Sequence, residues 1–207
     1  LWDCVVRLTI PRRFGSKSGI FALATAVNQQ KATEAIGLLK SDSPFSDIRL
    51  IHRGTTHQLS SSAQETILQE YRPALEAAQI PGNAEQALNL GSNFRILCAH
   101  RQGRNGVESF NQEAQRLLAK AMPEIPFDST WYAGRPVLIT RNDAQTGLRN
   151  GEIGMAVKGD DGAIVVAFSA EKADEAPRLF APSKLPIHET VFAMTIHKSQ
   201  GSQFKHV

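Results

Sequence analysis

The chain has 207 residues, of which 42% are hydrophobic and 21% are charged, and this composition excludes an intrinsically disordered chain. Its formal net charge of +3 permits nucleic-acid binding without arguing strongly for it. No apolar run is long enough to span a membrane, and the two cysteines, Cys4 and Cys98, are too few and too far apart for a disulfide framework or a zinc site.

The first 60 residues predict two strands and two helices. Residues 2–8 are typical of a strand that ends before a polar cluster containing Arg12 and Arg13. Apolar residues then recur at the spacing of one buried helix face, namely Ile20, Leu23, Ala24 and Val27. A short helix is expected over residues 32–39 and another strand over residues 48–51.

The following segment predicts a helix, a strand, a basic loop and a second helix. Ser62 and Glu65 form a capping box for a helix that ends near residue 79, which Pro73 is expected to kink or split. Residues 93–99 predict a strand. The helix after it is expected from its periodic apolar positions, Val107, Phe110, Ala114, Leu117, Leu118 and Ala121. Because helix amino termini attract anions, the intervening basic loop is a candidate phosphate contact.

Short β runs separated by turn residues follow. Strands are expected over residues 136–140, 152–157 and 163–168, with an Asn150-Gly151 turn before the second of them. These runs predict a small all-β insertion over residues 131–186.

The last apolar run, residues 190–196, is β-branched and aromatic, which suits a buried parallel strand. Hydroxyl, cationic and backbone N–H donors follow its carboxyl end, where ligands bind in open α/β sheets. Three strand-to-loop transitions, near Arg12, His100 and His197, thus deliver positive charge to what is predicted to be one edge of a parallel sheet. Phosphate is the expected ligand.

The order T-x-H-K-S-Q-G-x-x-F from Thr195 to Phe204 closely resembles motif V of superfamily 1 helicases. A solvated loop would be the better interpretation of an isolated His-Lys pair, but eight fitting residue types in order favour the motif. The resemblance implies that Thr195, His197, Lys198 and Ser199 hold single-stranded DNA. It also implies that Gln200 and Gly201 face a nucleotide, and it places Gln203 near the nucleotide sugar, where most relatives have an acidic residue.

The pattern L-x-x-x-R-R-F-x-x-x-S-G-I-x-x-L-A-x-x-V-N resembles motif IV of the RecD branch of this superfamily. That motif ends in Tyr-Arg-Phe, and its Arg reaches the γ-phosphate of ATP, so the resemblance assigns a catalytic and nucleotide-binding role to Arg13. Arg12 replaces the usual Tyr, which leaves open which arginine faces the nucleotide. Taken alone, the two arginines would suit a solvated turn.

Two further stretches resemble the same branch. The pattern R-I-L-C-A-x-R-x-G-x-x-G-V-x-x-x-N implies backbone contacts to DNA from Arg101, Arg104 and Asn111, although helix solubility also explains Asn111. The stretch W-Y-x-G-R-P-V, with Asn-Gly-Glu-Ile-Gly after it, resembles the entry into an SH3-like insertion that lies against DNA. This makes Arg135 and Arg141 candidates; hairpin turns account equally well for the nearby asparagines.

The resemblance implies an α/β fold, namely a RecA-like P-loop NTPase second motor domain with an SH3-like β-barrel insertion. The motor domain is expected over residues 1–130 and 187–207, interrupted by the insertion at residues 131–186. It is expected to lack Walker A and to stop before motif VI. Because the sequence starts at Leu1 and has no leader, we expect a piece of a longer, cytoplasmic protein.

The implied activity is ATP- and Mg²⁺-dependent 5′ to 3′ translocation on single-stranded DNA in a complex with RecB and RecC, and the fragment alone is expected to be inactive. Two other interpretations stay open. The chain could come from a stand-alone RecD-like or conjugative relaxase-type helicase, which shares these motifs. It could also be a non-catalytic nucleic-acid-binding module, whose DNA affinity would be indifferent to nucleotide.

Overall fold

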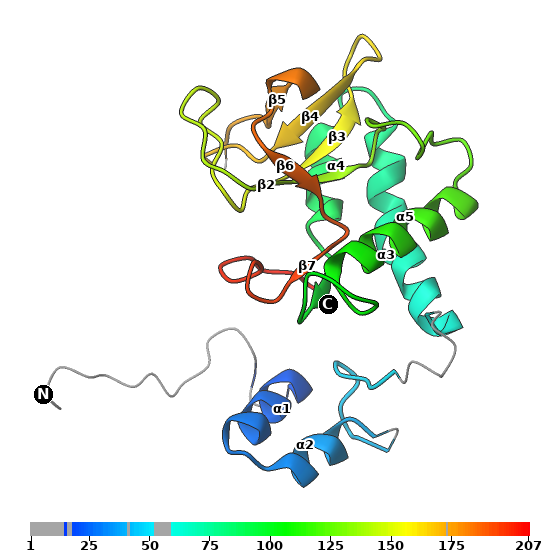
Figure 1. Cartoon of the computed structure of the whole chain (residues 1–207), viewed down its shortest axis with the longest axis vertical. Coiled ribbons are helices and arrows are strands. Elements are labelled where there is room, and N and C mark those ends of the chain that lie inside the picture. The colour runs from blue at the N-terminus through cyan, green and yellow to red at the C-terminus, as the bar shows by residue number, and fades with distance from the viewer. Residues whose placement is uncertain (1–14, 16–17, 41, 52–58, 173) are drawn as a thin grey trace, which may run out of the picture. The chain divides into compact units, whose positions relative to one another are not determined.

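The computed structural model describes residues 15, 18–40, 42–51, 59–172 and 174–207. The chain divides into two compact units, Leu1–Ser60 and Ser61–Val207, and most of their elements are labelled in Figure 1. The strand expected over residues 2–8, together with Arg12 and Arg13, lies outside the described residues.

The first unit contains the expected helices, α1 (Gly19–Asn28) and α2 (Ala32–Leu38). The face of α1 that was predicted to be buried is wrong, because Ile20, Ala24 and Val27 are exposed among the described residues. Asp47 caps the amino terminus of α1. Its carboxylate accepts hydrogen bonds from the Ser18 hydroxyl at 2.6 Å and from the Gly19 N–H at 2.9 Å. The hydrogen bond from Ser18 is the main reason that the pKa of Asp47 lies below its ordinary value. The strand predicted over residues 48–51 is wrong, because this short run has no partner strand among the described residues of the unit.

The described residues of the second unit form three α-helices, of which the first and third match the sequence patterns and the second was not predicted. They are α3 (Ser61–Ala78), α4 (Ala84–Gly91) and α5 (Val107–Ala121), and α3 continues through Pro73 without splitting. Ala74, Ala77 and Ala78 of α3 pack with Ala87 of α4 into a hydrophobic cluster. These small side chains let the two helices approach each other closely.

The three predicted β runs become the strands β2 (Pro136–Ile139), β3 (Ile153–Lys158) and β4 (Ile164–Phe168) of a five-stranded antiparallel sheet. Its other two strands, β5 (Arg178–Phe180) and β6 (His188–Thr190), were not predicted, and the strand order is β5-β4-β3-β2-β6. A short 3₁₀ helix, η2 (Pro182–Lys184), links β5 to β6. Met155, Val157 and Ala167 pack into the α3–α4 cluster. The sheet is therefore anchored on these two helices, next to which it is drawn in Figure 1.

The second sheet has two parallel strands, β1 (Ile96–Cys98) and β7 (Ala193–Thr195), with Cys98 opposite Thr195. The single strand predicted over residues 190–196 is therefore wrong in its extent. Thr190 belongs to β6 and pairs with Val137 in the antiparallel sheet, whereas Ala193 begins β7. The chain changes sheets at Val191 and Phe192, both fully buried, and an apolar run cannot report such a change because both strands need buried side chains.

Parallel strands, flanking helices and the antiparallel sheet confirm the predicted α/β class. Within the described residues, no helix combines the length and the apolar character that crossing a membrane requires.

Candidate functional site

Two of the predicted loops leave the same edge of the parallel sheet. β1 leads into residues 100–106, and the Val107 N–H donates to the His100 carbonyl at 3.1 Å, so this loop returns on itself before α5. β7 leads into a turn over residues 196–201. Because β1 and β7 are parallel and in register, the two loops begin side by side, which confirms the expected placement for two of the three basic loops.

The turn after β7 is held together by its own residues. The Lys198 N–H donates to the Thr195 hydroxyl at 3.2 Å, and the Ser199 hydroxyl donates to the Ile196 carbonyl at 2.8 Å. Gly201 has φ +89°, a conformation that side chains rarely adopt. The turn leaves His197 and Gln200 exposed, so an imidazole and an amide are accessible beside the sheet edge.

Glu189 joins the two loops and was not foreseen from the sequence. Its carboxylate lies 2.5 Å from Lys198 Nζ and 2.7 Å from Arg101 Nη2. Burial raises the pKa of Glu189, but the hydrogen bonds and charges of Lys198 and Arg101 outweigh burial and hold it below the ordinary value. Two predicted DNA contacts thus meet on one acidic side chain. An isolated glutamate before an apolar run carries no sequence signal for this role.

Arg135 lies against the same strand. Its Nε donates to the Thr190 hydroxyl at 3.0 Å and its Nη1 to the Thr130 carbonyl at 2.5 Å. The guanidinium lies over the Trp131 ring at 4.4 Å from its centroid, and the His188 ring lies 5.2 Å from the Trp131 ring between centroids. Burial lowers the pKa of Arg135. Arg135 therefore supports β6 in this structure.

The other residues predicted to contact DNA or nucleotide are exposed at the surface. Arg104 is exposed on the loop after β1, and Arg141 is exposed after β2. Gln203 is exposed after the turn and borders a cavity of about 180 Å³ together with Arg95 and Phe204. The roles of these residues stay predictions.

Three side chains, from α3, from α5 and from the residue before β1, hold the backbone where the chain changes sheets. Arg95 Nη1 donates to the Val191 carbonyl and the Tyr71 hydroxyl to the Phe192 carbonyl. The Asn111 amide donates to the Ala193 carbonyl at 3.1 Å and accepts from the Ala193 N–H at 3.0 Å. We call Arg95, Tyr71 and Asn111 the clasp. The amide of Asn111 is thus engaged with β7, and its predicted contact with DNA stays a prediction.

The clasp contains a buried charge. Arg95 is 1% exposed, and its Nη2 donates to the Gly91 carbonyl at 2.9 Å. Its guanidinium carbon lies 5.4 Å from the centre of the Phe204 ring. Burial lowers the pKa of Arg95 and raises that of Tyr71 to about 12. The positive charge is therefore stabilised by carbonyl dipoles and aromatic rings, and it fixes the segment that leads into the turn after β7.

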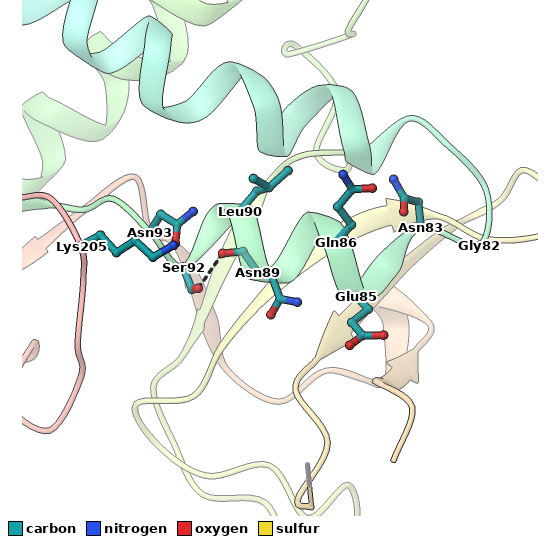
Figure 2. A pocket seen from close by; sticks show the side chains of 9 residues that line it. All are labelled: Gly82, Asn83, Glu85, Gln86, Asn89, Leu90, Ser92, Asn93 and Lys205. Atoms are coloured by element: carbon teal, nitrogen blue, oxygen red, sulfur yellow. Dashed lines mark hydrogen bonds between the residues drawn. The ribbon is translucent and has the colours of Figure 1, made fainter. Parts of the chain in front are cut away.

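A second, larger cavity lies along α4. Its volume is about 610 Å³, and Figure 2 shows amide side chains, including Asn83, Gln86 and Asn89, around it, with Lys205 at one end. None of the site residues predicted from the sequence lines this cavity.

Comparison with known proteins supports the resemblance seen in the motifs. The chain is 36% identical over 199 residues to "RecBCD enzyme subunit RecD" of Mycolicibacterium smegmatis, which covers 96% of this chain and 33% of that protein. The resemblance to RecD is confirmed. The RecD proteins of Mycobacterium tuberculosis and Haemophilus influenzae are 33% and 30% identical, over 98% and 99% of this chain. No family model matches the chain.

The chain spans about a third of the length of these RecD proteins, 32–33% in each case. The similarity nevertheless extends across nearly all of this chain, so it includes both loops at the sheet edge, the clasp and the antiparallel sheet.

Gly106 sets the shape of the loop after β1. A Cβ at this position would lie 2.6 Å from the carbonyl oxygens of Arg101 and Gln102, which are backbone atoms that cannot turn aside. We expect Gly106→Ala to displace Arg101 and to lower the free energy of unfolding by about 2 kcal/mol or more. Gly103→Ala is the matched control, because Gly103 has φ +88° but open space around it, and it should cost about 1 kcal/mol. Thermal unfolding of both variants measures the difference, and equal losses would contradict the steric argument.

Proposed function

We propose that this chain is part of the second motor domain of a RecD-type, ATP-dependent 5′ to 3′ DNA helicase. The parent protein would be a subunit of the exodeoxyribonuclease V complex with RecB and RecC, would act in double-strand break repair and recombination, and would be cytoplasmic. One observation carries the proposal: two cationic loops with helicase-like motifs leave the same edge of β1 and β7, in a chain that is similar to RecD along nearly its whole length.

The finer fold is part of this proposal. A RecA-like domain over residues 1–130 and 187–207 is supported by the parallel β1–β7 pair and by α5, which contacts both strands. An SH3-like insertion over residues 131–186 is supported by four antiparallel strands within that range, β2 to β5.

The proposed DNA contacts combine cations with hydroxyl and imidazole groups. Lys198 and Arg101 would bind backbone phosphates, and His197 is exposed beside them. Thr195, Ser199, Arg104, Asn111, Arg135 and Arg141 complete the proposed set. Contacts to phosphate give affinity without sequence preference, which is what a translocating motor needs.

The proposed nucleotide contacts are Arg13, Gln200, Gly201 and Gln203. Exposed amides such as those of Gln200 and Gln203 donate and accept hydrogen bonds, which fits the hydroxyl and phosphate oxygens of ATP. Mg²⁺ and most of the ATP would be bound by the first motor domain of the parent protein. When bound, ATP and its metal supply the transferring phosphoryl group, on which Arg13 would stabilise charge.

The proposed contacts to DNA and to the nucleotide lie close together in the sequence, so binding of the two ligands would be coupled. Lys198 and Gln200 belong to one self-bonded turn, so a movement of Gln200 towards the γ-phosphate would move Thr195, His197 and Lys198 along the DNA. Nucleotide binding and DNA grip would then be linked in one equilibrium.

The proposal is tested by ATP hydrolysis in the full-length parent protein, with and without single-stranded DNA. We expect stimulation by DNA and a DNA affinity that changes with the bound nucleotide. A well-folded protein without turnover, whose DNA affinity ignores nucleotide, would instead be a binding module. Co-purification with RecB and RecC distinguishes the complex from a stand-alone or relaxase-type helicase.

Lys198 provides a direct test of DNA contact. Lys198→Gln should weaken binding of single-stranded oligonucleotides of any sequence and reduce the slope of log K against log salt by about 0.7, the contribution of one phosphate. Lys205→Gln is the control, because Lys205 is an exposed lysine outside the proposed contacts. Fluorescence anisotropy over a salt series measures both variants. Identical slopes in the wild type and Lys198→Gln would contradict the proposed contact.

A further inference from the structure

Glu189 lies between two cations that come from different loops. One of its carboxylate oxygens, Oε1, is 2.5 Å from Lys198 Nζ, and the other, Oε2, is 2.7 Å from Arg101 Nη2. The side chains are 27% exposed for Glu189, 32% for Lys198 and 58% for Arg101. The two cations therefore converge on a single anionic group that solvent can reach.

A backbone phosphate has the chemistry to replace that group. Like the carboxylate, a phosphodiester presents two charged oxygens on one atom, and both groups accept short charge-assisted hydrogen bonds from lysine and arginine. Glu189 already uses one oxygen for each cation. Its carboxylate and a phosphate would therefore compete for the same donors.

The local charges favour replacement of the Glu189 carboxylate by phosphate over binding of phosphate beside the carboxylate. Arg101 has a second acidic neighbour, Glu108, but its Nε–Oε1 distance is 3.9 Å and both side chains are 58% exposed. The attraction of Lys198 and Arg101 keeps the pKa of Glu189 low, so the carboxylate is ionised at neutral pH. A phosphate that approached with Glu189 in place would meet a like charge.

We propose that Lys198 and Arg101 form one phosphate-binding site, which Glu189 occupies in the DNA-free chain and which a backbone phosphate of single-stranded DNA takes over by displacing the Glu189 carboxylate. The choice of DNA as the ligand rests on the proposed function. Glu189 is thereby a competitor within the chain, and it sets how tightly the motor holds DNA.

The location of Glu189 gives the exchange a structural consequence. Glu189 belongs to β6 and pairs with Leu138 of β2 in the antiparallel sheet, whereas its two cationic partners follow β1 and β7. The carboxylate thus ties the antiparallel sheet to the loops of the parallel sheet. Displacement by phosphate releases this tie just before the residues that the clasp holds.

The test measures binding of a fluorescent oligo(dT) to the full-length protein without nucleotide, at fixed salt. Glu189→Gln should bind roughly three- to tenfold more tightly than the wild type, because each exposed ion pair that it removes is worth at most about a factor of five. Glu108→Gln is the matched control. It removes the same charge beside the same arginine but leaves the proposed site occupied, so its affinity should change less than about twofold.

A second comparison shows whether the gain acts through the proposed site. In the Lys198→Gln background, the gain in log affinity from Glu189→Gln should be less than half of the gain in the wild-type background, because one of the two freed cations is missing. An equal gain in that background, or an equal gain from Glu108→Gln, would identify a general charge effect and overturn the inference.

Other outcomes are equally decisive. Weaker binding by Glu189→Gln together with a lower melting temperature, reproduced in Glu189→Ala, would make Glu189 a structural support and overturn the inference. Unchanged affinity with unchanged melting would also overturn it. In both cases binding by the wild type leaves the proposed function intact, whereas no binding by either protein would overturn the proposed function and this inference together.

Discussion

Arg13→Ala in the full-length protein is expected to lower DNA-stimulated ATP hydrolysis by about a hundredfold or more. An arginine at the γ-phosphate stabilises charge that develops on the transferring phosphoryl group, and alanine cannot replace it. Affinity for single-stranded DNA should change by less than about twofold, because Arg13 is not among the proposed contacts to DNA phosphates. Steady-state hydrolysis and oligonucleotide anisotropy measure the two effects separately.

Arg12→Ala is the matched control for this prediction. It removes the same charge one residue earlier, and the motif assigns the γ-phosphate contact to the second arginine. We expect hydrolysis in Arg12→Ala to stay within about threefold of the wild type. A large loss in Arg12→Ala with a small one in Arg13→Ala would reverse the assignment. Parallel loss of hydrolysis and DNA binding in Arg13→Ala would reject the separation of the two roles.

Arg95→Met is expected to loosen the segment before the turn that carries Lys198. Methionine fills similar space without hydrogen-bond donors, so the carbonyl groups of Val191 and Gly91 lose their partner while they stay buried. Each unsatisfied carbonyl costs about 1–3 kcal/mol, and relief of the buried charge offsets part of this cost. We expect a net loss of about 3 kcal/mol in local stability.

Hydrogen exchange of the peptide covering residues 191–196, in the full-length protein, measures this loss. A change of about 3 kcal/mol corresponds to exchange that is more than about a hundredfold faster. Arg72→Met is the control, because Arg72 is 44% exposed on α3 and its ion pair with Glu76 is long, at 3.9 Å. It should leave exchange unchanged. Equal protection from hydrogen exchange in Arg95→Met and the wild type would show that the free-energy cost of burying the charge cancels the stabilisation by its hydrogen bonds.

The clasp explains how a short strand can position the turn that follows it. β7 has only three residues, too few to be held by strand pairing alone. Asn111 on α5 bonds the backbone of β7 itself at Ala193, whereas Arg95 and Tyr71 hold the two residues that precede the strand. A variant of Tyr71 would therefore change the turn after β7, although Tyr71 is not one of the proposed contacts to DNA or nucleotide.

Much of the second unit could be predicted because its signals are local. The apolar periodicity of residues 107–121 matches α5, and turn residues such as Asn150-Gly151 separate the strands as expected. The strand predicted over residues 48–51 failed for a related reason. A four-residue apolar run satisfies the local pattern, but a strand also needs a partner, which composition cannot supply.

The sequence by itself determined the α/β class, the helices other than α4, three strands of the antiparallel sheet and the two cationic loops, because these depend on periodicity, turn residues and motif order within a few residues. Only the tertiary structure decided that residues 188–190 and 193–195 belong to different sheets and that the clasp holds the residues between them. It also decided that Glu189 forms ion pairs with both Lys198 and Arg101. These features depend on contacts between residues 82 to 121 positions apart in the clasp and 88 apart for Glu189 and Arg101. Side-chain hydrogen bonds and ion pairs over such separations leave no periodic trace, since they are satisfied only when the chain has folded.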